Sequence, residues 1–161
     1  MIFVTLGTQE KSFSRLLEAV EEFAKCHPEN HIIVQSGHTK FVSDICEVFD
    51  YLSRDQMGEY YQKADLIITH GGVGSILEIL QLGKKMIAVP RLKKYGEHIN
   101  DHQLQIIDNF SRLGYLLPCY DLGQLEKTID QIATFEPKHF VSNQSHFLDC
   151  LKQDIEQLLR S

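Results

Sequence analysis

The 161-residue sequence has no apolar run approaching the roughly 18 residues with which a helix spans a bilayer. Its first residues, MIFVTLGT, lead directly into a predicted strand, without the basic leader and small-residue cleavage site of a secretion signal. We therefore expect a mature cytoplasmic protein. With 43% hydrophobic residues, the chain is predicted to form one domain, residues 1–161, with a substantial core.

Several motifs of metal, redox and phosphate chemistry are also missing. The four cysteines show no CxxC spacing, which favours free thiols. No GxxxxGK[ST] sequence is present, and no GxGxxG opens the first strand–helix unit, which argues against a P-loop kinase or ATPase and against a dinucleotide site. There is no DxD pair. The formal net charge of −6 argues against a nucleic-acid partner.

Strand-like and helix-like segments alternate along the chain, which predicts a Rossmann-like, doubly wound parallel α/β sheet. Continuous apolar runs indicate buried strands, and apolar residues recurring every three to four positions indicate helices. The expected strands are 2–6, 32–35, 46–49, 66–69, 86–89 and 115–117. The expected helices are 12–26, 55–64 with Asp55 as N-cap, 75–82, 100–113, one over 125–132 capped by Asp121, and one at about 142–160.

Two glycine-bearing turns directly follow predicted strands. The first contains Gly7 and Thr8; the second runs from Gly71 through Gly72 and Gly74 to Ser75, which is expected to open a helix. In a doubly wound sheet such turns lie at the carboxyl edge, where ligands bind. Glycines allow close backbone approach, and a helix N-terminus attracts anions. The second turn therefore predicts a diphosphate site, whereas the first is also explained by a tight turn alone.

Two side chains beside the second turn each have two interpretations. Glu78 lies three residues after Ser75, so it either completes a capping box or accepts hydrogen bonds from a ribose diol. His70 ends the preceding strand, where it is either a structural histidine or a contact to a phosphate or sugar oxygen. The sequence leaves both choices open.

Charged residues between positions 84 and 102, after the predicted helix 75–82, raise two further possibilities. His98, Asp101 and His102 have helical spacing for a metal, but they do not form HExxH and have no evident third ligand, so no metal site is expected. A basic stretch is predicted to be either solvated surface or an attraction for an anionic membrane or lipid diphosphate. It comprises Lys84, Lys85, Arg91, Lys93 and Lys94.

Taken together, four segments resemble the C-terminal, nucleotide-sugar-binding half of glycosyltransferase family 28, a GT-B-fold family. The segments are FVTLGTQEKSFSRLL, ADLIITHGGVGSILEIL, GKKMIAVPR and EHINDHQLQI, and the likeness covers nearly the whole chain. The likeness is greatest to free-standing, single-domain members of the family. These are the small subunit of the two-part N-acetylglucosaminyltransferase that acts on dolichol-linked sugar, and the PssE-type subunits of capsule and exopolysaccharide synthesis.

The resemblance implies a role for each matching position. Gly7 and Thr8 would form a first phosphate loop, and residues around Tyr51 and Leu52 would contact the uracil ring. Phosphate and ribose contacts would come from the second turn, and Asp101, His102 and Gln103 would approach the donor sugar. The implied binding set is Gly7, Thr8, Tyr51, Leu52, His70, Gly72, Gly74, Ser75, Glu78, Asp101, His102 and Gln103.

The implied activity is that of an inverting, metal-independent UDP-sugar transferase without a cofactor. The acceptor half of a GT-B enzyme has no counterpart in this sequence. A membrane-anchored partner subunit is therefore expected to supply it, to hold this chain at the inner membrane face, and to bring a polyprenyl-diphosphate-linked acceptor. The helix at 142–160 is the candidate docking element, although ordinary core packing also explains it.

No residue stands out as the catalytic base, and His38, in the polar loop after the second strand, is the one candidate within this chain. A non-catalytic accessory subunit that stabilises or activates a partner transferase is the alternative function. A UDP-sugar epimerase of related fold is less favoured. Among transferase roles, capsule or exopolysaccharide synthesis is preferred over a eukaryotic one.

Overall fold

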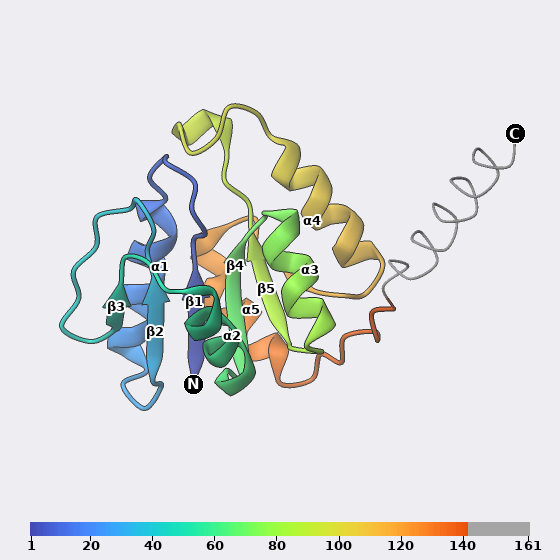
Figure 1. Cartoon of the computed structure of the whole chain (residues 1–161), viewed down its shortest axis with the longest axis horizontal. Helices are drawn as coiled ribbons and strands as arrows, with labels where there is room; N and C mark the ends of the chain where they lie inside the picture. The colour runs from blue at the N-terminus through green and yellow to red at the C-terminus, as the bar shows by residue number, and fades with distance from the viewer. Residues whose placement is uncertain (142–161) are drawn as a thin grey trace, which may run out of the picture.

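The computed structural model describes residues 1–141, which form a fully parallel sheet in the order β3-β2-β1-β4-β5-β6 (Figure 1). The strands are β1 (Ile2–Thr5), β2 (Ile32–Gln35), β3 (Glu47–Phe49), β4 (Leu66–His70), β5 (Met86–Val89) and β6 (Leu117–Pro118). The chain runs outward from β1 to β3 and then returns to place β4 on the other side of β1. The strand order therefore reverses between β1 and β4, as in Rossmann-like sheets.

Helices cover both faces of this sheet, so the doubly wound α/β fold predicted from the sequence is confirmed (Figure 1). The helices are α1 (Ser14–Cys26), α2 (Arg54–Lys63), α3 (Val73–Gln81), α4 (His102–Arg112) and α5 (Leu125–Ile132), with the short 3-10 helices η1 (Lys93–Tyr95) and η2 (Leu122–Gln124). Helices α1 and α5 pack on one face, whereas α2, α3 and α4 pack on the other.

The pleat of the central strands divides the core into two layers. In β1, Ile2 and Val4 point to the side of α1 and α5, while Phe3 points to the side of α2 and α3. Strand β4 alternates in the same way, with Ile68 on the first side and Ile67 on the second. A parallel strand covered on both faces must be apolar at every position, which explains the continuous hydrophobic runs.

Element boundaries differ from the prediction where capping decides them. Ser53, not Asp55, is the N-cap of α2: its Oγ accepts from Gln56 N at 3.2 Å, and Gln56 Oε1 accepts from Ser53 N at 2.9 Å. This reciprocal pair is a capping box. Helix α4 begins at His102, and the last strand comprises Leu117–Pro118 instead of 115–117.

The predicted basic stretch does not form a patch, because β5 separates its two halves. Lys84, before the strand, donates from Nζ to Gln62 O and Ala64 O. Arg91, after the strand, is only 1% exposed. The charges of Lys84 and Lys85 therefore lie before the start of β5, and those of Arg91, Lys93 and Lys94 lie after its carboxyl end.

Across residues 1–141, no helix combines the length and apolarity needed to cross a membrane. The helix predicted at 142–160, and with it the expected docking element, lies outside the described residues.

We expect Phe3→Ala to lower the free energy of unfolding by about 3–5 kcal/mol, because it removes a large side chain from the centre of the sheet. Phe3 is fully buried and contacts the rings of Tyr60 and Tyr61, with centroids 5.2 and 5.6 Å away. Chemical denaturation measures the loss. Val42→Ala is the control: Val42 is 89% exposed, and its truncation should change stability by less than about 0.5 kcal/mol.

Candidate functional site

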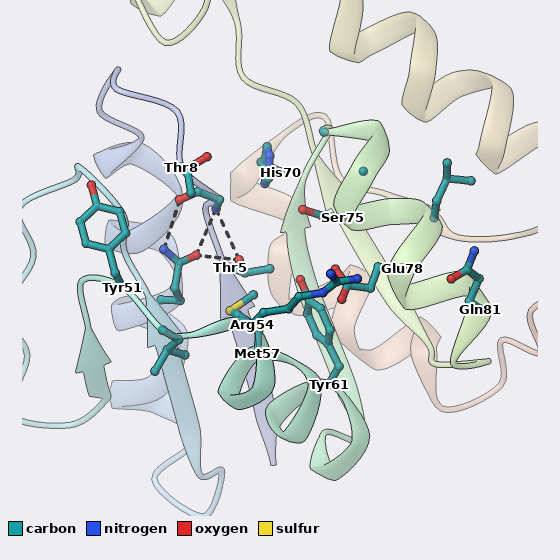
Figure 2. Close-up of a pocket in the computed structure, with 16 residues that line it drawn as sticks. Thr5, Thr8, Tyr51, Arg54, Met57, Tyr61, His70, Ser75, Glu78 and Gln81 are labelled. Atoms are coloured by element: carbon teal, nitrogen blue, oxygen red, sulfur yellow. Dashed lines mark hydrogen bonds between the residues drawn. The ribbon is translucent and has the colours of Figure 1, made fainter.

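A cavity of about 750 Å³ opens at the carboxyl edge of the sheet, beside the point where the strand order reverses (Figure 2). Its walls come from the ends of β1, β2 and β4 and from the facing sides of α2 and α3. The lining residues are Thr5, Gly7, Thr8, Gln35, Tyr51, Leu52, Arg54, Met57, Tyr61, His70, Gly72, Gly74, Ser75, Leu77, Glu78 and Gln81. Both predicted glycine turns therefore reach one cavity.

The first glycine turn is held by a side chain from the neighbouring strand. Buried Gln35, at the end of β2, donates from Nε2 to Gly7 O at 3.1 Å and to Asp50 O at 3.0 Å. Its Oε1 accepts from Gly7 N at 3.1 Å and from Thr5 Oγ1 at 2.7 Å (Figure 2). Gly7 has φ +67°, a conformation that favours glycine. The amide of Gln35 thus fixes the loop that carries Thr8.

The two glycine turns meet on the imidazole of His70. A Cβ atom added to Gly7 would lie 2.5 Å from His70 Cε1, and one added to Gly72 would overlap His70 Nε2. Glycine at these positions is therefore required by close approach to the ring. This packing is what is expected of a structural histidine, one of the two interpretations of His70. The ring also forms part of the cavity wall.

The buried position of His70 also fixes its charge. Burial, with a smaller contribution from the Arg91 cation, lowers the pKa of His70 to about 4. The imidazole is therefore neutral at physiological pH and adds no positive charge to the cavity. Its Nδ1 is buried and has no hydrogen-bond partner among the described residues.

Helix α3 begins two residues earlier than the sequence suggested. Gly72 is its N-cap and makes no side-chain cap bond, and Val73 is the first helical residue. Ser75 therefore lies inside the first turn, and of the two interpretations of Glu78 the capping box with Ser75 is wrong. The amide groups that open α3 have no side-chain cap, and they carry the positive end of the helix dipole. This geometry suits an anion.

Glu78 faces the cavity beside the hydroxyl of Tyr61 (Figure 2). Tyr61 is 1% exposed, and burial together with the Glu78 charge raises its pKa to about 12, against the opposing effect of Ser75 and Thr5. The phenol therefore stays protonated at neutral pH. Glu78 itself is solvent-exposed, so its carboxylate is accessible to a ligand hydroxyl.

None of the three residues predicted to approach the donor sugar lines the cavity. Gln103 is buried and uses Oε1 to accept from Arg91 N at 2.9 Å, while its Cβ packs against Gly71. Asp101 Oδ1 accepts from Lys93 N at 2.9 Å, and His102 lies at the exposed start of α4. The start of α4 is thus adjacent to the second glycine turn, but these side chains are engaged in local structure.

His38, the candidate base within this chain, also lies outside the cavity lining. Its exposed ring makes an edge contact with Tyr51, with ring centroids 5.6 Å apart. Tyr51 lines the cavity and is 51% exposed, so the two rings form one part of its rim. Among residues 1–141, no three His, Cys, Asp or Glu side chains converge as a metal site requires.

Arg91 is a buried residue that connects the surrounding loops. Its Nη1 donates to Lys11 O at 2.6 Å and its Nη2 to Leu6 O at 3.1 Å, on either side of the first glycine turn. Its own backbone amide is bonded to Gln103. Burial lowers the pKa of Arg91 to about 10, and Glu97 opposes this effect, so the side chain remains cationic at neutral pH.

Sequence reasoning missed several lining residues. Thr5 and Gln35 carried a signal, because each is a polar residue at the end of an otherwise apolar strand. Arg54, Met57 and Tyr61 did not stand out, since they reach the cavity only through the placement of α2. Leu77 and Gln81 line it from α3.

The chain belongs to the glycosyltransferase family 28 C-terminal domain family, whose sequence model matches residues 1–158. The curated relatives include the UDP-N-acetylglucosamine transferase subunit ALG13 of Homo sapiens, 33% identical over 130 residues, which are 73% of this chain and 11% of the human protein. The protein of that name in Saccharomyces cerevisiae is 29% identical over 102 residues, 62% of this chain and 45% of the yeast protein. The chain thus spans about a tenth of the human relative's length.

Solved structures agree with the fold. An NMR structure of ALG13 matches with a TM-score of 0.62 at 23% identity, covering 93% of each chain. MurG of Acinetobacter baumannii matches with a TM-score of 0.62 at 19% identity, covering 94% of this chain and 49% of MurG. The fold is therefore that of one half of a GT-B glycosyltransferase, as the sequence predicted.

Gly72 and Gly74 provide a matched test of the contact with His70. We expect Gly72→Ala to lower the free energy of unfolding by roughly 1–3 kcal/mol, because the added methyl group overlaps the imidazole. No atom lies within 4 Å of a Cβ added to Gly74, so Gly74→Ala should leave stability unchanged or slightly higher. Thermal and chemical denaturation measure both; equal effects would contradict the predicted contact.

Stability should also depend on pH through His70. Its folded-state pKa of about 4 lies below the ordinary value of 6.5. Between these values the unfolded chain binds the proton more tightly, so stability falls as pH falls. We expect the wild type to lose roughly 2 kcal/mol more than His70→Asn between pH 7 and pH 5. Denaturant titrations at both pH values measure the difference, and parallel pH profiles would contradict it.

Proposed function

We propose that this chain is the donor-binding catalytic subunit of a heteromeric, inverting glycosyltransferase that uses a UDP-sugar. The observation that carries the proposal is the convergence in one cavity of both glycine turns, the uncapped start of α3 and the carboxylate of Glu78. Family membership supports the same class of activity.

Each wall of the cavity has chemistry suited to one part of a UDP-sugar. The backbone amides around Gly7 and at the start of α3 would hold the diphosphate, since aligned N–H groups and the helix dipole stabilise anions. The exposed carboxylate of Glu78 would accept hydrogen bonds from the ribose diol. Tyr51 and Leu52, at the opposite end, would contact the uracil ring.

The relatives named above favour N-acetylglucosamine as the donor sugar, because they are described as subunits of UDP-N-acetylglucosamine transferases. Asp101, His102 and Gln103 remain the residues proposed to approach that sugar. Gln103 Oε1 already accepts one hydrogen bond, from Arg91 N, and its amide nitrogen would be the group that donates to a sugar hydroxyl.

The acceptor side would come from a partner subunit. We propose that a membrane-anchored partner brings a polyprenyl-diphosphate-linked acceptor and holds this chain at the inner membrane face. His38 at the cavity rim remains the candidate base from this chain. The relatives' names give no support to the expected role in capsule or exopolysaccharide synthesis.

Calorimetric titration with UDP, UDP-galactose, UDP-glucose and UDP-N-acetylglucosamine, with and without magnesium, tests the proposal. We expect metal-independent binding that Glu78→Ala weakens roughly 10- to 100-fold, because hydrogen bonds to a charged group are lost. Glu59→Gln, on the exposed side of α2 and outside the cavity lining, is the control and should bind as the wild type does.

Wild-type affinity in Glu78→Ala would remove this carboxylate from the site. The alternative function, a non-catalytic accessory subunit, predicts no UDP binding by the chain alone and UDP binding by its complex that Glu78→Ala leaves unchanged. It also predicts that sugar transfer by the complex survives Glu78→Ala. Loss of transfer from the intact complex would exclude that alternative.

A further inference from the structure

The cavity has few charges of its own for an anionic ligand. Among its lining side chains, only Arg54 and Glu78 carry a formal charge at neutral pH, since burial keeps His70 neutral. Glu78 repels a diphosphate, and the chain as a whole has a net charge of −6. The start of α3 contributes only a partial positive charge, about half of an elementary charge. Among the residues that the structure describes, Arg54 is thus the one full positive charge on the cavity wall.

Arg54 is placed at the cavity rim by the capping box of α2. It is the first residue of the helix, directly after Ser53, whose reciprocal bonds with Gln56 fix the local backbone. The side chain extends across the cavity toward Glu78 on α3 (Figure 2). Yet the described residues offer it no hydrogen bond and no ion pair within 4.0 Å, so its guanidinium is available to a ligand.

The other cations near the site are already engaged or lie elsewhere. Arg91 is buried and donates to the backbone around the first glycine turn. Lys63 lies at the far end of α2, where it pairs with Glu59. Neither lines the cavity.

We propose that Arg54 forms the ion pair with the diphosphate of the bound nucleotide, and that it makes the cavity select charged nucleoside diphosphates over uncharged nucleosides. This inference rests on the proposed function. A guanidinium is suited to the role because its planar fork can donate two parallel hydrogen bonds to phosphate oxygens. A long, exposed side chain at the rim can also move onto a ligand after the nucleoside has bound.

The test compares UDP with uridine, which lacks the diphosphate. Calorimetry measures UDP binding, and NMR titration measures the weaker binding of uridine. We expect Arg54→Met to weaken UDP binding about 10-fold or more while changing uridine binding by less than about 2-fold, because a charge-assisted bond to phosphate is lost. Arg54→Lys should recover part of the loss, since it restores charge without the fork.

Lys63→Met supplies a matched control, because it removes one positive charge from the same helix outside the cavity. It should leave both affinities unchanged. Added salt should weaken UDP binding to the wild type more than to Arg54→Met, since an exposed ion pair is screened. Arg54 is exposed, so thermal unfolding should confirm that every variant folds.

The outcomes separate this inference from the proposed function. If the wild type binds UDP and Glu78→Ala does not, while Arg54→Met matches the wild type, Arg54 has no role and only this inference fails. Equal losses for UDP and uridine would assign Arg54 to the nucleoside or to local structure and would also overturn it. If the wild type and its complex bind neither ligand, the proposed function fails as well.

Discussion

The parallel pairing of β1 with β4 is the constraint on which the site depends. Their register sets Thr5 opposite Thr69, so the turns that follow the two strands leave the sheet side by side. One residue further along β4, His70 fills the space between these turns, and Gly7 and Gly72 both approach its ring too closely for any side chain of their own. A shift of register would separate the two turns and would leave the imidazole without this packing.

Two buried side chains then hold the first turn from opposite sides. Gln35 reaches it from β2 and bonds both the N–H and the C=O of Gly7, while Arg91 reaches it from beyond β5 and bonds Leu6 O and Lys11 O. Burying an amide and a guanidinium is unfavourable unless they are hydrogen-bonded. The loop carbonyls meet that requirement for the amide nitrogen of Gln35 and for Nη1 and Nη2 of Arg91, whereas Arg91 Nε has no hydrogen-bond partner among the described residues.

The sequence was most informative where one interaction dominates. Apolar runs identified the strands because a strand buried on both faces needs apolar side chains on both. The glycine turns were then placed by the ends of those strands. Prediction failed where two local solutions compete: Ser53 and Asp55 are both good N-caps, and only the bonds to Gln56 decide between them. The sequence indicated Gln103 and not Arg54 as a site residue. Tertiary packing, which no local pattern encodes, buries Gln103 outside the cavity lining and leaves Arg54 facing the cavity.

Because His70 is neutral, it supplies no positive charge that would attract an anion into the cavity. A protonated imidazole between the two turns would favour a diphosphate, but the same close packing that positions the turns excludes water and disfavours the charge. Geometry and charge are therefore supplied by different residues. Buried groups set the spacing of the backbone amides: neutral Gln35 and His70, and Arg91, whose charge is directed to loop carbonyls. Among the described residues of the cavity wall, full positive charge comes from the exposed rim, where solvation makes an unpaired cation tolerable before a ligand arrives. Under the proposed function, electrostatic attraction of the nucleotide would then be sensitive to salt and nearly independent of the protonation of His70.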